Sequence, residues 1–357
     1  MILSGQWTEE LNCADTGCHD GSRAEERSAV MRLLTIRWAS YLLLTAVLLS
    51  MPPAAFGGQV HGCVTQNDAG QAKAKADVAE AKKSYYRADY YEALGNEDLA
   101  KCNIDAAIAD FTTAIAKNPK YVEAYSDRGS AYLTKGDMDA AIADATSAIE
   151  LNPFFPNAYY NRGFARQVEG DVDGAIADLT KAIEFNSRFE KAYMVRGNSK
   201  RTKGDLDGAI ADYTKVIEIN PRSADAYFNR GAARRTRGDL DGAIADLTKT
   251  IQIDPNLAEA YVNRGAARAS KGGLDGAIAD FTKAIAIKPD SAEAYVGRGA
   301  AKGTKGDMDG AIADFTKAIE INPNLAEAYL NRSAARYTKG DADGANADSA
   351  AAARLEK

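Results

Sequence analysis

The stretch Asp275-Gly-Ala-Ile-Ala-Asp-Phe-Thr-Lys-Ala-Ile-Ala286 decides the fold of this 357-residue chain. Its opening phrase recurs on a constant 34-residue period, without insertion, through two-thirds of the sequence. The eight copies begin at Asp105, Asp139, Asp173, Asp207, Asp241, Asp275, Asp309 and Asp343. A fixed period of this size is typical of a stacked array, in which each unit covers the apolar face of its neighbour.

The apolar spacing within this stretch predicts a helix rather than a strand. The apolar residues lie on one stripe of a helix with about 3.6 residues per turn. They are Ala277, Ile278, Phe281, Ala284 and Ile285. We expect the Asp275 carboxylate, just before the stripe, to cap the helix. Pro289 then discourages continuation.

A second helix is predicted to precede the first in each unit. In residues 258–273, Glu259 lies in the first turn and Gly272 can close the helix. A glycine inside a helix costs about 1 kcal/mol relative to alanine, so its recurrence indicates close approach of the partner helix. The recurring glycines are Gly129, Gly163, Gly197, Gly231, Gly265 and Gly299. Each unit is therefore predicted to be an antiparallel helix pair joined by a short turn.

This pattern resembles the signature of the tetratricopeptide repeat family. That signature places an aromatic and a small residue in the first helix, then alanine, aromatic and alanine in the second, then proline. The matching residues are Tyr295, Gly299, Ala311, Phe315, Ala318 and Pro323. The resemblance covers about residues 88–357. It implies an all-α fold, a right-handed α-solenoid superhelix of about eight 34-residue helix-turn-helix repeats.

The period divides the array into eight expected units. They are 88–121, which is degenerate, then 122–155, 156–189, 190–223, 224–257, 258–291, 292–325 and 326–357. In the last unit Asn346 replaces the repeated isoleucine and Ser349 the aromatic residue. Its second helix offers little apolar surface to a further repeat, so we interpret unit 8 as a C-terminal cap.

The region ahead of the array reads as a targeting segment. Residues 31–57 combine arginines with a 14-residue apolar run at 38–51, shorter than the roughly 20 residues of a spanning helix. This pattern predicts a signal peptide, or alternatively an uncleaved signal anchor. Both place the repeats outside the cytoplasm, in the periplasm or the extracellular space. Residues 1–30 are then a disordered upstream extension, and 58–87 a linker with a capping helix.

Composition offers little catalytic chemistry. The only histidines, His19 and His61, precede the array, and the net charge of −6 gives no sign of nucleic-acid binding. We therefore expect no enzyme activity, no cofactor and no metal site. Cys63 and Cys102 could form a disulfide in an exported protein or remain free thiols, and both readings stay open.

Recurring charged pairs are given a structural interpretation. Arg264 and Arg268 lie one turn apart in the first helix of unit 6, and Asp280 lies in the second. We expect contacts from Arg264 to Asp280, repeated along the stack, to form a ladder rather than an anion site. As exposed pairs they would each contribute about 0–1 kcal/mol.

The family resemblance implies a concave surface lined by first-helix residues that point away from their partner helix. The candidates for a partner-binding groove are Tyr160, Phe164, Lys191, Met194, Asn198, Arg201, Phe228 and Arg235. Aromatic faces and flexible cations suit an extended peptide with apolar anchors and acidic groups. Alternatively, Tyr160 and Phe228 fill space between repeats.

Two functions remain after this reading. The first is a non-catalytic protein-protein interaction scaffold, exported, that binds peptide segments of partner proteins in its concave groove. The second is a structural or assembly factor of the cell envelope that acts through self-association or packing in a larger complex. Membrane contact would come only through an uncleaved N-terminal segment. The partner, the pathway and the oligomeric state are not specified by the sequence.

Overall fold

The computed structural model describes residue 96 and residues 103–355. The predictions that lie outside the described residues are those for 1–30, 31–57, 58–87, Cys63 and Cys102.

Fifteen helices and no strand are found in the described part of the chain. They are α4 Ile104–Lys117, α5 Val122–Lys135, α6 Met138–Leu151, α7 Pro156–Glu169, α8 Val172–Phe185, α9 Glu190–Thr202, α10 Leu206–Ile219, α11 Ala224–Arg237, α12 Leu240–Ile253, α13 Ala258–Ser270, α14 Leu274–Ile287, α15 Ala292–Thr304, α16 Met308–Ile321, α17 Ala326–Thr338 and α18 Ala342–Leu355. Their lengths of 13–14 residues follow the sequence period and confirm the all-α expectation.

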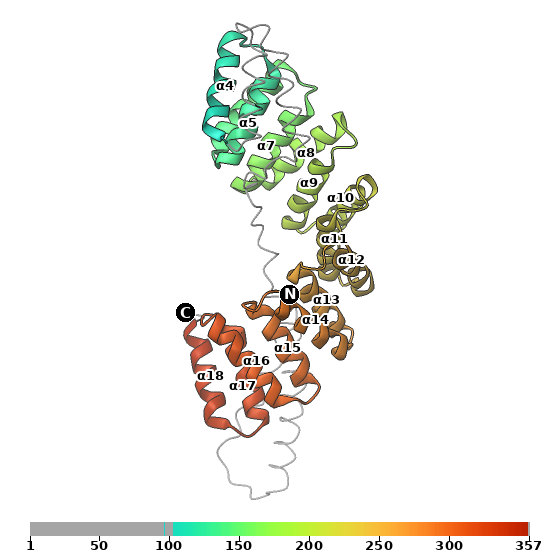
Figure 1. Cartoon of the computed structure of the whole chain (residues 1–357), viewed down its shortest axis with the longest axis vertical. Helices are drawn as coiled ribbons and strands as arrows, with labels where there is room; N and C mark the ends of the chain where they lie inside the picture. The colour runs from blue at the N-terminus through green and yellow to red at the C-terminus, as the bar shows by residue number, and fades with distance from the viewer. Residues whose placement is uncertain (1–95, 97–102, 356–357) are drawn as a thin grey trace, which may run out of the picture.

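Consecutive helices pack as antiparallel pairs, and each pair packs against the next. From α5 onward, the odd-numbered helix is the first of its unit and the even-numbered helix the second. Figure 1 shows the pairs following one another along a curved path, with α4 near one end, α18 near the other and α10–α12 at the outermost bend. This arrangement is the solenoid that the repeat predicts.

The turn inside most units is built from glycine and aspartate. At the end of α11, Gly238 takes a φ of 92°, a left-handed conformation that glycine adopts without steric cost. The amide of Asp239 donates to the Arg234 carbonyl at 2.9 Å, which closes the helix. The Asp239 side chain then accepts from the Gly242 amide at 3.0 Å and caps α12. One dipeptide therefore ends one helix and starts the next.

The prediction that Asp275 caps its helix was wrong. Helix α14 begins at Leu274, so the cap position belongs to Gly273, which has no side chain to accept a hydrogen bond. Asp275 lies inside the first turn and forms an ion pair with Lys305 of the next unit. In most units the first aspartate of the Gly-Asp-Xaa-Asp-Gly phrase is the cap, as Asp239 is, and the second reaches forward to the neighbouring unit.

The core consists mainly of alanine, and most units add one or more larger side chains. Ala277, Phe281 and Ala284 are at most 1% exposed, whereas Ile278 and Ile285 are only half-buried. The predicted stripe therefore faces the core with its alanine and aromatic edge, and its isoleucines lie at the margin. A core of small side chains lets the two helices of a unit pack closely.

The recurring glycines hold the helices of each unit close together, as predicted. A Cβ atom added to Gly265 would lie 3.1 Å from the Phe281 ring, and one added to Gly197 would lie 2.7 Å from the Tyr213 ring. Any larger residue at these positions would push the first helix away from the second. Glycine lowers the stability of the first helix, but only glycine leaves room for the ring of the second helix to pack against the backbone.

Candidate functional site

A ladder of arginines and aspartates joins the helices from unit 2 to unit 8. In unit 6, Arg264 Nη2 lies 2.7 Å from Asp280 Oδ1 and Arg264 Nε lies 3.0 Å from Oδ2. The third arm, Nη1, donates to the Thr248 hydroxyl of the preceding unit at 3.1 Å. The equivalent arginines are Arg128, Arg162, Arg196, Arg230, Arg298 and Arg332. Each arginine therefore ties two units together, as a structural ladder should.

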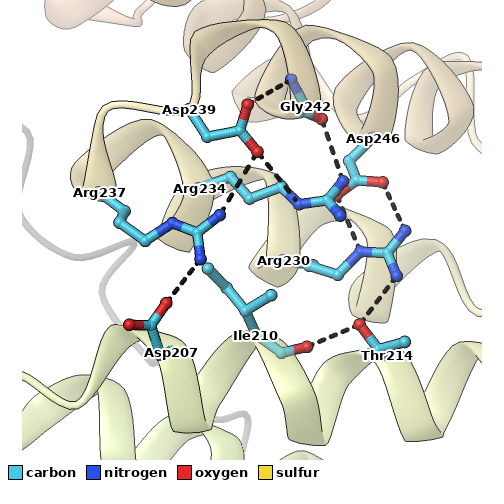
Figure 2. Close-up of polar contacts among 9 residues, drawn as sticks. All are labelled: Asp207, Ile210, Thr214, Arg230, Arg234, Arg237, Asp239, Gly242 and Asp246. Atoms are coloured by element: carbon cyan, nitrogen blue, oxygen red, sulfur yellow. Dashed lines mark hydrogen bonds and ion pairs between the residues drawn. The ribbon is translucent and has the colours of Figure 1, made fainter.

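The ladder is buried, which corrects the expectation of weak exposed pairs. The Asp280 side chain is 4% exposed and also accepts from Arg268 Nη1 at 2.8 Å. Figure 2 shows the same arrangement in unit 5, where Arg230 and Arg234 converge on Asp246. Removing one member of such a buried pair leaves an uncompensated charge, at a cost of about 3–5 kcal/mol.

A second, exposed ladder runs between neighbouring units. The cation at the end of each first helix pairs with the second aspartate of the preceding unit, as Lys203 does with Asp173 at 2.6 Å. The series is broken once, where Glu169 occupies the place of the cation. Glu169 and Asp139 line the same surface depression as Lys135. Together the two ladders pair cations of the first helices with aspartates of the second helices.

The aromatic candidates are packed between repeats. The Tyr160 ring lies 5.1 Å from that of Phe189 and 6.3 Å from that of Phe164. Burial raises the pKa of Tyr160 to about 12. Phe228 is 9% exposed and packs with Leu247. The space-filling interpretation therefore describes the positions of Tyr160 and Phe228, and their contact with a partner stays a prediction.

Lys191 and Met194 lie on α9 and differ in exposure. Lys191 is exposed, whereas Met194 is half-buried against the cluster around Tyr213. The Asn229 amide donates to the Met194 sulfur at 3.6 Å, which links α9 to α11. These contacts place Met194 at the junction of units 4 and 5.

Unit 4 contains a buried polar cluster that the sequence reading did not identify. Tyr213 is fully buried and donates its hydroxyl hydrogen to Asn198 Oδ1 at 2.7 Å. Burial raises the pKa of Tyr213 to about 12, while the nearby Arg201 guanidinium acts to lower it. The signal was present in the sequence, because Tyr213 is the only tyrosine at a position otherwise filled mainly by phenylalanine or leucine.

Arg235 differs from the other arginines of its helix. Helix α11 carries four arginines, and Arg230, Arg234 and Arg237 all form ion pairs, as Figure 2 shows. For half-buried Arg235, no ion pair is found among the described residues, and its Nε is buried without a hydrogen-bond partner. Burial lowers the pKa of Arg235. A guanidinium in this situation can bind an anion from outside the chain.

Metal-binding clusters and membrane-spanning helices are absent from the described residues. In residues 103–355, no group of three or more His, Cys, Asp or Glu side chains is arranged to hold a metal ion. Within the same range, every helix is too short or too polar to cross a bilayer.

The packed helix pairs and the ladders that join them define a helical-repeat protein. Family models for the TPR repeat match residues 197–235, 233–272, 267–306 and 304–340, and one for the tetratricopeptide repeat matches 92–156. These matches cover more than half of the chain, which belongs to the tetratricopeptide repeat family. Repeats of this family generally serve protein interactions and not catalysis, and membership supports that role.

Several solved structures are similar to parts of the chain. MamA is 34% identical, with a TM-score of 0.42 over 45% of this chain and 94% of its own. YrrB, described as a TPR protein with an unusual peptide-binding site, is 25% identical, with a TM-score of 0.46 over 52% of this chain and 95% of its own. The C-terminal part of a TPR repeat-containing protein from Cytophaga hutchinsonii is 19% identical, with a TM-score of 0.55 over 69% of this chain and 99% of its own. This last likeness is one of fold. No curated protein sequence matches the chain.

Proposed function

We propose that this chain is an exported, non-catalytic scaffold that holds an extended segment of a partner protein against the groove side of units 3–5. The groove side is defined here by α7, α9 and α11 and carries the candidates from Tyr160 to Arg235. The proposal of export depends on the residue pattern of 31–57.

One observation carries the proposal: among the described units, only units 4 and 5 have an arginine on the groove side seven residues after a large apolar side chain. The Arg–Asp ladder is the same in every unit from 2 to 8. Seven residues apart on the inner stripe, α9 has Met194 and Arg201 and α11 has Phe228 and Arg235. Units 6 and 7 have small aliphatic residues at these places, with Val262 and Ala269 in α13. Repeat architecture alone does not require this variety.

The residue types favour a peptide over other ligands. Large apolar side chains beside guanidinium groups are typical of surfaces that bind protein segments. An extended segment can contact successive first helices because its side chains reach several units at once. Nucleic acid is disfavoured by the net charge of −6 and by ladders that already neutralise many cations.

Photo-crosslinking can test which face binds. Peptides selected from a random 12-residue display library on the purified array would be mixed with two variants that carry a photoreactive residue. One replaces Lys191, exposed on α9, and the other replaces Lys249, exposed on the second helix α12. We expect adducts from position 191 and at most background from position 249. Equal labelling of both positions, or labelling of 249 alone, would reject binding on the groove side.

A second candidate, self-association as an assembly factor, is favoured by one exposed patch. Phe154 is 72% exposed and stacks edge-on against Phe185 at 5.5 Å, and Phe185 itself is 37% exposed. Exposed aromatic side chains of this kind are frequent at protein interfaces. Sedimentation over a range of concentrations distinguishes the candidates. A dimer that dissociates in Phe154→Ser supports self-association, and a monomer at all concentrations supports the peptide scaffold.

A further inference from the structure

We propose that the groove between α9 and α11 contains a carboxylate-binding site, in which Arg235 is the principal ligand group and Arg201 assists it. The inference rests on the proposed function and specifies the partner: a protein segment with an acidic residue close to a large apolar residue. Tyr213 and Asn198 act as positioning residues for Arg201.

The first step is the unsatisfied state of Arg235. Every other half-buried lysine or arginine of the first helices whose contacts are described has an acidic partner, as Arg234 has in Asp246 and Lys200 in Asp212. Arg235 has none among the described residues, and its Nε is shielded from solvent. Keeping a guanidinium in such a place without a partner is costly. An incoming carboxylate offsets that cost and accepts a charge-assisted, bidentate pair of hydrogen bonds.

The second step is the way the structure holds the neighbouring cation. The Tyr213 hydroxyl donates to Asn198 Oδ1 at 2.7 Å, and the Arg201 guanidinium lies close enough to affect the ionisation of Tyr213. Arg201 and Arg235 occupy equivalent places in successive units, 34 residues apart. They lie on α9 and α11, the first helices of adjacent units, so that one extended segment can reach both.

Units 6 and 7 lack the tyrosine–asparagine pair of unit 4. At the places of Asn198 and Tyr213, unit 6 has Ala266 and Phe281, and unit 7 has an equivalent alanine and phenylalanine. The buried tyrosine–asparagine pair occurs only in the unit that also carries Arg201. A buried hydroxyl must be hydrogen-bonded to be tolerated, so packing alone favours phenylalanine there. The pair is therefore better explained by the arginine beside it than by the fold.

The third step gives the chemistry of the ligand. Met194, which is half-buried on α9, lies seven residues before Arg201, and this separation corresponds to about 10 Å along a helix. An extended peptide spans that distance in about three residues. The expected segment therefore carries an apolar side chain and a carboxylate about three residues apart. The carboxylate can belong to an Asp or Glu side chain or to a C-terminus.

The test is a double-mutant cycle between protein and peptide. The best peptide from the display library would be synthesised with blocked ends, in its acidic form and with Asp or Glu replaced by the amide. A third form would carry the amide side chain with a free C-terminus. Dissociation constants would be measured for the wild type, Arg235→Gln, the double variant Asn198→Ala/Tyr213→Phe, and Arg222→Gln. Arg222 is exposed in the loop before α11 and serves as the matched control.

The site predicts a specific coupling. Replacing the acid by the amide should weaken binding at least tenfold in the wild type and in Arg222→Gln, and less than about twofold in Arg235→Gln. In the double variant, replacing the acid by the amide should weaken binding by a factor between those of the wild type and Arg235→Gln. The affinity for the amide peptide should be unchanged, because the double variant disturbs the position of Arg201 and not the apolar contacts. Recovery of affinity in the third form would assign the site to a C-terminal carboxylate.

Two results would overturn the inference, and they differ in meaning. If the acid-to-amide loss is the same in Arg235→Gln and in the wild type, the carboxylate site is wrong while peptide binding stands. If no library peptide crosslinks to position 191, the proposed function fails together with this inference. Circular dichroism of each variant should show unchanged helicity, so that a loss of coupling reports on the site.

Discussion

Units 4–5 and units 6–7 share one skeleton and differ on one face. Both pairs have the Arg–Asp ladder, for example Arg230 with Asp246 and Arg264 with Asp280, each at 2.7 Å. On the groove side, units 4–5 present Arg201 and Arg235, while units 6–7 present mainly alanine, valine and glycine at the stripe positions. Unit 4 also has a buried tyrosine–asparagine pair in its interior. The fold thus requires the ladder and leaves the groove side free to vary. The variation in units 4–5 is where we expect function.

The largest expected effect tests the shared skeleton. Asp246→Ala and Asp280→Ala each remove a carboxylate that accepts from two arginines. Each should lower the free energy of unfolding by about 3–5 kcal/mol, because buried guanidinium groups lose their partner. Urea unfolding followed by circular dichroism measures both. A loss below 1 kcal/mol in either variant would mean that the ladder does not stabilise the array.

A smaller effect tests the difference between the two regions. Tyr213→Phe removes a hydroxyl and leaves Asn198 Oδ1 without its donor. We expect a loss of about 1–3 kcal/mol, the cost of an unsatisfied buried polar group. The double variant Asn198→Ala/Tyr213→Phe reproduces the alanine and phenylalanine of unit 6 and should recover most of that loss. If the double variant is less stable than the single one, unit 4 does not tolerate the alanine and phenylalanine that unit 6 has at these two places.

Alkaline pH should expose the same difference. The pKa of Tyr213 is raised from 10.0 to about 12 in the folded protein, so the folded state retains a proton that the unfolded state loses. The stabilisation is complete below pH 10 and is lost as the pH rises towards 12. At pH 11 the wild type should have lost about 1.4 kcal/mol more than Tyr213→Phe, both relative to pH 9. Parallel unfolding curves for the two proteins at both pH values would contradict the assignment.

The smallest effect concerns the break in the exposed ladder. Glu169 occupies a place that is a lysine or arginine in the other described units, near Asp139. Glu169→Lys restores an exposed pair and should stabilise the chain by about 0.2–1 kcal/mol, less at high salt. Thermal melting in 20 mM and 500 mM salt, about a 25-fold range, tests both parts of this expectation. A salt-independent gain would point to packing instead of charge.

Local patterns predicted most of the fold. The apolar stripe of 277–285 and the recurring Gly265 predicted a closely packed helix pair, and Phe281 against Gly265 confirms it. The cap was misplaced because two aspartates of one phrase compete for the role. Only the backbone geometry shows that the helix begins at Leu274, one residue before Asp275.

The site was less accessible from the sequence. Their places in the repeat predicted Arg201 and Arg235 as groove residues. Whether an arginine has an acidic partner depends on which side chains surround it in the folded structure, and the sequence does not show this. Tyr213 occupies the aromatic place of the repeat pattern, and spacing does not show whether its hydroxyl meets Asn198. The depth of the ladder was misjudged for a similar reason, since Asp280 looks polar and therefore exposed in sequence but is 3% exposed in the structure.

The most direct test of the division between skeleton and groove measures affinity and stability in two variants together. Arg201→Glu/Arg235→Glu reverses both groove cations, and Asp314→Ala breaks the ladder in unit 7. For Arg201→Glu/Arg235→Glu, we predict that the affinity for a selected acidic peptide falls at least tenfold. The melting temperature of this variant should stay within about 2 °C of wild type. For Asp314→Ala, we predict unchanged affinity and a melting temperature lowered by about 6 °C or more. Unchanged affinity in the groove variant would contradict the account.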